Sequence, residues 1–533
     1  MIAPTAKPAG GGILFGISAT WVQTVAAVLI NLVQVPLLYR YLARDAMGAW
    51  MIFASIGLFL LLWDLGLGVT FARSMAYARG RKQGDPAAPR NADADPADLL
   101  RTVSLTYWVL GAALFLVALG AGWIYLGRLK FDVTPFQTVW LAWVVYALGC
   151  AVNLGAATPF HCLNGLGDVG IEQLLGTACN LLALAANVIV LVSGAGIVAL
   201  SVVFVARGFV ARAAAWIILK RRHAWLFERA GQFSFTRLKS LGGDSLRILL
   251  TRLGAFLTLQ TPGLVIAQVM GPKHVPDFVA AWVIVQVGMA AGMAVGQAIT
   301  PHAAAAYAAG DSVRFLRQHR NACAAALFLV SLWCLGYLLW AREGMTLWLG
   351  PGHFLGYGVL APLLILGTLE VHHSIHANFV WSSGRWPFAP WALAAGVINL
   401  ALGIWWAGAR GEAGMAWAMC AAQLLTNNWF VVYYALKRLN VPVRRYARDV
   451  LAPVAGVLLA SAALALAAKT GIPRILDIAS AFRGLPISDV AAMVVGAAAT
   501  ASCAFALFWR FAMDGDARSA IRFQASRLGA RSA

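Results

Sequence analysis

The chain has 533 residues, of which 61% are hydrophobic and only 12% are charged. Its mean hydropathy is +0.75 and its formal net charge is +20. A water-soluble protein of this composition would have too few polar side chains to cover its exterior, which excludes a soluble globular domain. The positive charge lies in short loops between apolar stretches. This placement indicates membrane topology and attraction to anionic lipid headgroups, and we expect no nucleic-acid partner.

About fourteen apolar stretches of roughly twenty residues cover nearly the whole chain, and each is long enough to cross a bilayer as a helix. The sequence predicts an all-α integral membrane protein whose segment before residue 13 is not a cleaved signal peptide. The predicted spans are 13–39, 46–78, 102–127, 136–159, 172–193, 196–219, 244–270, 276–300, 321–341, 356–382, 388–408, 413–436, 449–468 and 488–510.

Most of the 41 Lys and Arg residues lie at the two termini and in the loops that follow even-numbered spans. Their clusters occur at residues 79–82, 220–222, 437–448 and 518–531. Because positively charged loops stay on the cytoplasmic side, we expect both termini in the cytoplasm.

The sequence repeats itself weakly. Residues 37–79 align with residues 265–307, so that Trp50 matches Phe278 and Gly68 matches Gly296. The interval holds six predicted spans, an even number, so the two halves should have the same orientation, as in parallel-repeat transporters. We therefore expect two six-helix lobes and an appended helix pair. The predicted parts are an N-terminal lobe at 1–222, a cytoplasmic linker at 223–243, a C-terminal lobe at 244–437, and spans thirteen and fourteen with a basic tail at 438–533.

Residues 37–77 contain the motifs Tyr41-Leu42-Ala43, Gly48-Ala49-Trp50 and Asp64-Leu65-Gly66-Leu67-Gly68, followed by Arg73. A weaker echo occurs at Met270-Gly271-Pro272-Lys273. The segment resembles the opening of the O-antigen-type polysaccharide and oligosaccharide flippases, in the superfamily that also contains MATE drug extruders and lipid II flippases. It departs at Ala43, where these flippases usually have Gly, and no motif names the sugar.

The resemblance implies a membrane flippase rather than an enzyme. Such a protein moves a polyprenyl-pyrophosphate-linked oligosaccharide from the cytoplasmic to the outer leaflet of a bacterial inner membrane by alternating access, for surface polysaccharide biosynthesis. The implied partners are the lipid-linked oligosaccharide, anionic membrane lipids, a polysaccharide polymerase and chain-length machinery. No cofactor is implied.

Five arginines lie inside predicted spans, where a guanidinium facing lipid is costly. They are Arg73, Arg207, Arg212, Arg247 and Arg252. The planar guanidinium donates paired hydrogen bonds to phosphate oxygens, so we expect these residues to line a vestibule that binds a pyrophosphate. The alternatives are extension to the headgroups for Arg73 and Arg247 and internal salt bridges for Arg207 and Arg212.

Asp64 and Glu370 lie near the midplane of their predicted spans, about fifteen residues from the end. An intramembrane carboxylate can titrate, so both are candidates for coupling to a proton or sodium gradient, with His373 and His376 as possible relays beside Glu370. The alternative for Asp64 is structural, as a partner of an arginine or of backbone opened by Gly66 and Gly68. A zinc site at these histidines would need a second ligand cluster, which the sequence does not place, so we expect no metal site.

The seven cysteines have no CxxC spacing and most lie in apolar runs, so we expect core side chains rather than disulfides or metal ligands.

Two other function classes fit parts of the sequence. A cation-coupled multidrug extruder of the same superfamily would favour acids over arginines in its cavity. An integral-membrane glycosyltransferase or ligase would need an acid pair or a large outer domain, but the acid pairs lie in predicted loop or tail sequence: Asp93 with Asp95, and Asp514 with Asp516. No GxSxG, HExxH or Walker A motif occurs, so neither a hydrolase nor an ATP-driven pump is indicated.

Overall fold

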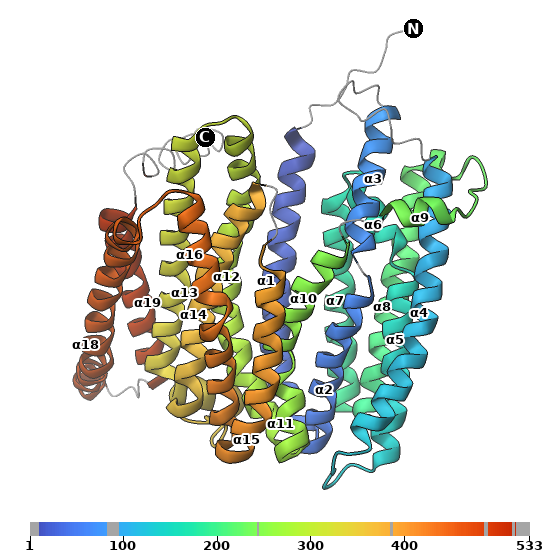
Figure 1. The fold of residues 1–533 in the computed structure, drawn as a ribbon. Helices are drawn as coiled ribbons and strands as arrows, with labels where there is room; N and C mark the ends of the chain where they lie inside the picture. Colours follow the sequence, from blue (N-terminus) through green and yellow to red (C-terminus); the bar gives the residue numbers. More distant parts are fainter. Residues whose placement is uncertain are drawn as a thin grey trace. The chain divides into compact units, whose positions relative to one another are not determined.

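The computed structural model describes residues 10–64, 66–82, 95–241, 245–383, 387–483, 489–513 and 518. Every regular element in this part of the chain is a helix, which confirms the all-α class (Figure 1). The chain divides into two compact units, residues 1–276 (unit 1) and 277–533 (unit 2).

Unit 1 contains eleven labelled α-helices and three short 3₁₀ turns. The helices are α1 (Gly10–Tyr41), α2 (Arg44–Leu60), α3 (Leu67–Lys82), α4 (Pro96–Leu126), α5 (Phe136–Gly155), α6 (Thr158–Gly165), α7 (Val169–Val192), α8 (Gly196–Arg222), α9 (Phe235–Leu241), α10 (Ser245–Leu259) and α11 (Pro262–Met270). The turns are η1 (Leu61–Asp64), η2 (Ala224–Phe227) and η3 (Pro272–His274). In this unit α5 packs between α4 and α8, and α1 packs along α7 (Figure 1).

Unit 2 begins within α12 (Val275–Ala308). The elements that follow are α13 (Ser312–Leu349), α14 (Tyr357–Ser382), α15 (Ala389–Leu425), α16 (Asn427–Arg438), α17 (Val443–Tyr446), the π-turn η4 (Ala447–Leu451), α18 (Ala452–Arg483), α19 (Asp489–Leu507) and the π-turn η5 (Phe508–Ala512). In this unit α14 packs against α13, α15 and α16, and α18 packs against α19.

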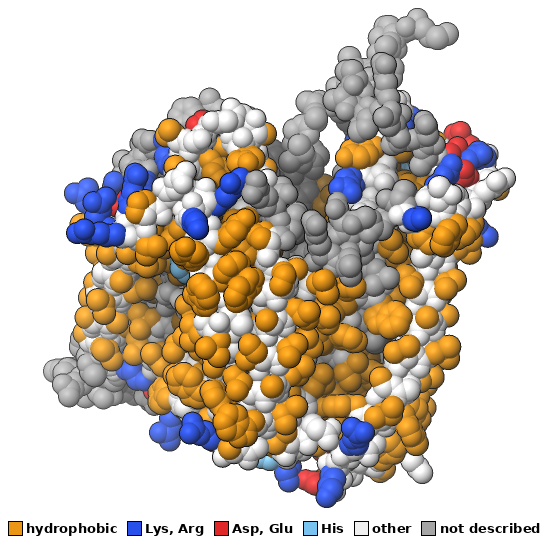
Figure 2. Space-filling model, viewed as in Figure 1, with side chains coloured by type: hydrophobic (Ala, Val, Ile, Leu, Met, Phe, Trp, Pro, Cys, Tyr) orange, Lys and Arg blue, Asp and Glu red, His pale blue; other side chains and the backbone are white. Residues whose placement is uncertain are grey.

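Among the described residues, eleven helices are long and apolar enough to cross a membrane, or twelve if the bent pair Leu249–Leu259 and Pro262–Met270 is one span. Large apolar side chains such as Trp108, Leu116 and Ile189 are exposed, as expected of surfaces that face lipid. Figure 2 shows hydrophobic side chains over the middle of the visible face, with Lys and Arg toward its ends. The protein is therefore a multi-pass membrane protein.

Two predicted spans are joined in one apolar stretch, which accounts for part of the difference from fourteen, and another predicted span is broken without changing the number. Residues 389–438 form one long apolar stretch, although Gly411 has a non-helical backbone (φ 63°, ψ −145°) that divides α15 in two. The predicted span 46–78 is also not one helix, because η1 and the turn after it separate α2 from α3. Its repeat counterpart in α12 continues as helix from Val275 to Ala308, so this break is specific to the first half.

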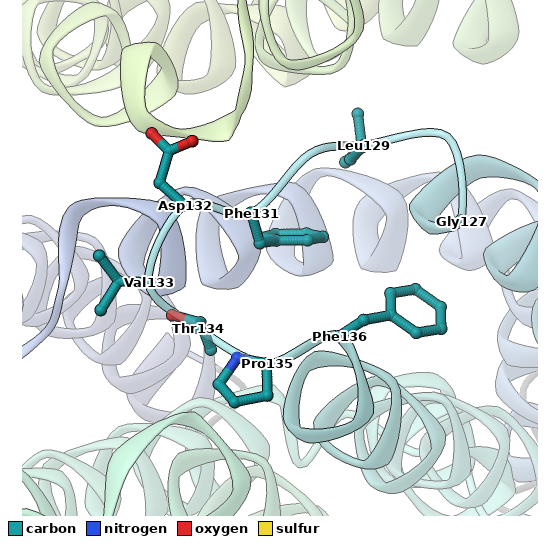
Figure 3. A pocket seen from close by; sticks show the side chains of 8 residues that line it. All are labelled: Gly127, Leu129, Phe131, Asp132, Val133, Thr134, Pro135 and Phe136. Atoms are coloured by element: carbon teal, nitrogen blue, oxygen red, sulfur yellow. The ribbon is translucent and has the colours of Figure 1, made fainter.

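The loop between α4 and α5 is anchored from the start of α2. The buried Asp45 carboxylate accepts hydrogen bonds from the backbone N–H groups of Val133 and Thr134, each at 2.8 Å. Figure 3 shows the loop with Phe131 and Phe136 beside its pocket and the Asp132 carboxylate pointing away. That carboxylate forms an ion pair with Lys273 at 2.9 Å.

At the other end of unit 1, the segment after α8 docks onto the first turn of α4. The Asp98 carboxylate forms ion pairs with Arg229 and Arg237, both at 2.7 Å, and accepts a backbone hydrogen bond from Gln232 at 2.8 Å. Part of the predicted linker 223–243 is thus held against the helices of unit 1. The lobe boundaries expected from the sequence stay a prediction.

Candidate functional site

The break between α2 and α3 carries the first polar cluster, which we call the Asp64 cluster: Asp64, Tyr107 and His161. The Asp64 Oδ1 accepts hydrogen bonds from the Tyr107 hydroxyl and, at 3.1 Å, from the N–H of Gly68. His161 Nε2 lies 3.9 Å from the same oxygen, and its ring stacks on that of Tyr107 with 5.7 Å between centroids. Asp64 thus both caps the start of α3, as the structural alternative holds, and faces two side chains that the sequence did not single out.

Local sequence explains why His161 reaches this carboxylate. The helix of α5 ends at Gly155, and α6 restarts at Thr158 with Pro159 in its first turn, where the missing N–H costs no hydrogen bond. A side chain at Gly68 would meet the His161 ring, because a Cβ there would lie 2.4 Å from Cε1. The D-x-G-x-G motif therefore supplies both the acid and the space for its partner.

A pocket of about 380 Å³ adjoins this cluster between α3 and α6. His161, Arg73 and Asn164 supply its polar lining. Arg73 is exposed and lines this pocket together with His161 of the Asp64 cluster.

Arg212 lies behind the same cluster and is turned into unit 1. Its Nε donates to the carbonyl oxygen of Asn153 at 2.8 Å, and its guanidinium lies 5.5 Å from the ring centroid of Phe160. Arg252, on α10, is exposed.

Arg207 is half-buried and points toward a different helix. Its Nη1 donates to Asn180 Oδ1 on α7 at 2.7 Å, and its guanidinium lies 5.3 Å from the ring centroid of Phe204. Within the described part of the chain, no carboxylate pairs with Arg207 or Arg212. The side chain of Arg247 lies outside the described residues.

A second basic pocket of about 450 Å³ lies at the ends of α3 and α8. Its lining includes Arg79, Lys82, Arg222 and His223, and a single described acid, Asp168. Lys82 Nζ sits over the Trp225 ring, 4.4 Å from its centroid. Four cationic or titratable donors around one open pocket suit an anionic headgroup.

Unit 2 holds the second cluster, which we call the Glu370 cluster: Glu370, His373, Gln423 and Asn427. The Glu370 carboxylate is 4% exposed, lies 3.9 Å from His373 Nδ1 and accepts a hydrogen bond from Gln423. Asn427 Nδ2 lies 3.2 Å from His373 Nε2. Three buried oxygens of this cluster have no hydrogen-bond donor in the described part of the protein: Glu370 Oε1, Gln423 Oε1 and Asn427 Oδ1.

The structure separates the histidines that the sequence grouped. His373 belongs to the Glu370 cluster, but His376 lies on another face of α14 against His319 and Cys323 of α13. The sequence reading missed His161, Tyr107, Gln423 and Asn427 because single polar residues in apolar runs give no periodic signal.

No protein-family model and no curated protein matches the chain. Solved structures share its fold. An inward-facing structure of a multidrug resistance MATE family transporter of the MOP superfamily is 16% identical, with a TM-score of 0.63, over 80% of this chain and 98% of that one. The lipid II flippase MurJ in an inward closed conformation is 11% identical, with a TM-score of 0.63, over 93% of this chain and 99% of that one. A MOP superfamily transporter from Pyrococcus furiosus, for which a binding pocket of reversed polarity is described, is 15% identical, with a TM-score of 0.57, over 80% of this chain and 95% of that one.

Proposed function

We propose that this chain, which has the fold of the MOP superfamily transporters, is a flippase for a polyprenyl-pyrophosphate-linked oligosaccharide. It would carry this lipid from the cytoplasmic to the outer leaflet of a bacterial inner membrane by alternating access. The observation that carries the substrate class is Arg73 in the pocket beside His161 and Arg212 behind it, neither of which has a carboxylate partner among the described residues. Arg252 joins them as a prediction from the sequence.

The arginines favour an anionic headgroup. A guanidinium stays charged in a low-dielectric site and donates two parallel hydrogen bonds to phosphate oxygens. A site for cationic drugs would need unpaired acids in their place, and Asp64 is already bonded to Tyr107 and Gly68. The reversed pocket polarity described for the Pyrococcus furiosus transporter supports the view that polarity within this fold follows the substrate.

The basic pocket beside Asp168 supports a second contact with the substrate or with anionic lipids. Its donors include Arg79 and Lys82, which lie on the same helix as Arg73, about 1.7 and 2.5 turns further along α3. The C-terminal half of α3 would therefore present cations to a headgroup from more than one of its faces. A polysaccharide polymerase and chain-length machinery remain the expected partners on the product side.

Coupling to a proton or sodium gradient is assigned to the Glu370 cluster and to Asp64. A buried oxygen without a donor is costly, and Glu370 Oε1 would be satisfied by a small cation or by a proton on the carboxylate. His373 contacts the carboxylate and supplies a second titratable group. His376 contacts His319 and His372 rather than Glu370 in the described part of the protein, so the relay expected at His376 is not part of this proposal.

The substrate assignment is tested with Arg212→Ala and Arg252→Ala in proteoliposomes that contain a fluorescent polyprenyl-pyrophosphate-linked sugar. We expect flipping to fall at least tenfold, and Arg→Lys to restore it only in part, because an ammonium lacks the paired donors. Arg128→Ala, on the exposed loop after α4, is the matched control.

Two results would redirect the assignment. Efflux of a cationic dye driven by an imposed ion gradient, with no effect of the arginine variants, would identify a multidrug extruder. Transfer of the sugar to an acceptor by the purified protein would identify a glycosyltransferase or ligase. Normal flipping in the Arg212→Ala, Arg252→Ala double variant would remove the basis of the pyrophosphate proposal.

A further inference from the structure

Three side chains with metal-binding atoms meet in the interior of unit 2. His319 and Cys323 lie one turn apart on α13, and His376 faces them from α14. Their exposed fractions are 2%, 1% and 0%. One ligand atom from each lies within 4.8 Å of those of the other two. The sequence alone could not predict this group, because His319 and Cys323 lie more than fifty residues before His376 in the chain.

The distances between these atoms match a tetrahedral metal site. With metal–nitrogen bonds of about 2.0–2.1 Å and metal–sulfur bonds of about 2.3 Å, the edges of a tetrahedron are about 3.3 Å between nitrogens and about 3.6 Å between sulfur and nitrogen. Cys323 Sγ lies 3.6 Å from His319 Nε2 and 3.8 Å from His376 Nε2. Two edges of the site therefore fit an ion. The contact between the two imidazoles joins His319 Nε2 to the other ring nitrogen of His376, Nδ1, at 3.0 Å, and binding through Nε2 requires the rings to give up this contact.

Two further groups lie beside His376. His372 Nε2 lies 3.3 Å from His376 Nε2, and the Tyr446 hydroxyl of α17 lies 3.1 Å from the same nitrogen. A nitrogen that binds a metal has no lone pair or proton left for a hydrogen bond. An ion bound through His376 Nε2 would therefore displace the Tyr446 hydroxyl from this nitrogen.

The surroundings select a soft ion and keep water out. The rings of Phe379 and His319 pack edge to face at 5.0 Å, and Phe315 packs on Phe379 at 5.2 Å. No carboxylate contacts the group among the described residues, so a hard oxygen-seeking ion such as Mg²⁺ or Ca²⁺ has no ligands here. One thiolate and two imidazoles suit Zn²⁺ or Cu⁺.

We propose that His319, Cys323 and His376 bind one Zn²⁺ or Cu⁺ ion that ties α13 to α14. On binding, the Cys323 thiol gives up its proton and the sulfur becomes the anionic ligand. The ion fixes α14, the helix that also carries Glu370, but the proposal does not depend on the transport function.

The test uses the full-length protein purified in detergent after metal depletion and reloading with Zn²⁺, or with Cu⁺ under reducing conditions. Elemental analysis should give about one ion per chain for the wild type and less than about a tenth for Cys323→Ser and His319→Gln. Cys334→Ser is the matched control, because Cys334 is buried on the same helix but bonds to Leu364. Competition then identifies the preferred ion, which is the one that stays bound to the protein when a chelator is added.

Cobalt provides a direct readout on the wild-type protein, which does not depend on whether a variant folds. Co²⁺ loaded into the wild type should give a thiolate-to-metal charge-transfer band and the visible spectrum of a tetrahedral ion, both absent in Cys323→Ser. Tyr446→Phe should keep the stoichiometry, because the hydroxyl is not one of the proposed ligands. A wild type that retains no ion and gives no cobalt band, or equal metal content in wild type and Cys323→Ser, overturns the proposal.

Discussion

The hydroxyl of Tyr107, in the middle of α4, donates a hydrogen bond to the carboxylate of Asp64, at the break between α2 and α3. Tyr107 is fully buried. This bond joins a helix of the main bundle to the one point where the second predicted span is interrupted. A change in the charge of Asp64 is therefore felt by both elements.

Tyr107→Phe should destabilise the protein by about 1–3 kcal/mol, because it leaves a half-buried carboxylate short of a donor. It should also reduce the response of flipping to an imposed gradient. Thermal unfolding in detergent and a proteoliposome assay measure the two effects. The matched control is Tyr125→Phe, which removes a comparable bond to the Leu264 carbonyl and should affect stability alone. Equal transport in both variants would count against a coupling role for Asp64.

Gly68→Ala should impair transport while the protein still folds. The new Cβ would lie 2.4 Å from the His161 ring, which is 33% exposed and can move aside, so its contact with Asp64 is lost. Flipping rates measure the loss of transport, and size-exclusion profiles show whether the variant still folds. Gly120→Ala in α4 places a Cβ with nothing within 4 Å and should behave like the wild type. An active Gly68→Ala variant would show that the His161 contact is dispensable.

Glu370→Gln should abolish or strongly reduce the response of flipping to a proton or sodium gradient. The amide keeps the shape of the side chain but can neither titrate nor offer a charge to a cation. Asp64→Asn gives the matching change in unit 1. Measuring flipping in vesicles under each gradient separates proton from sodium coupling. If both variants respond like the wild type, the carboxylates are structural and downstream polymerisation drives the net flow.

Asp168→Asn should destabilise unit 1 above about pH 4 and lose this effect at lower pH. Burial raises the pKa of the Asp168 carboxyl, but a hydrogen bond from His223 and the charge of Arg222 lower it more, so the pKa lies below its usual 3.8. A carboxyl with a lowered pKa stabilises the fold above its unfolded pKa, and the contribution disappears as pH falls through the folded pKa.

Thermal unfolding of wild type and Asp168→Asn, from about pH 6 to about pH 3, measures this difference. The Tm gap between them should narrow as the solution becomes more acidic. Asp132→Asn is the control, because its ion pair with Lys273 is exposed and should add little stability at any pH. A gap that stays constant with pH would mean that Asp168 acts through shape rather than charge.

The sequence by itself determined the structural class of this protein and the residues that are candidates for a functional role. Apolar runs of membrane-spanning length must lie in lipid, where a helix satisfies all of its own backbone hydrogen bonds. The all-α fold therefore followed from composition and length. The cost of charge in lipid singled out Arg212, Asp64 and Glu370 without any tertiary information. The motif from Asp64 to Gly68 pointed to the superfamily whose fold the solved structures share.

Only the tertiary structure decided which of these residues meet. His161 and Tyr107 reach Asp64 from helices far along the chain, and neither stands out in its own apolar run. His373 and His376 are only about 60° apart around α14, but α14 packs against several helices, and His373 meets Asn427 of α16 while His376 meets His319 of α13. Contacts between distant helices depend on how the helices pack, and side-chain periodicity within one helix carries no information about its neighbour.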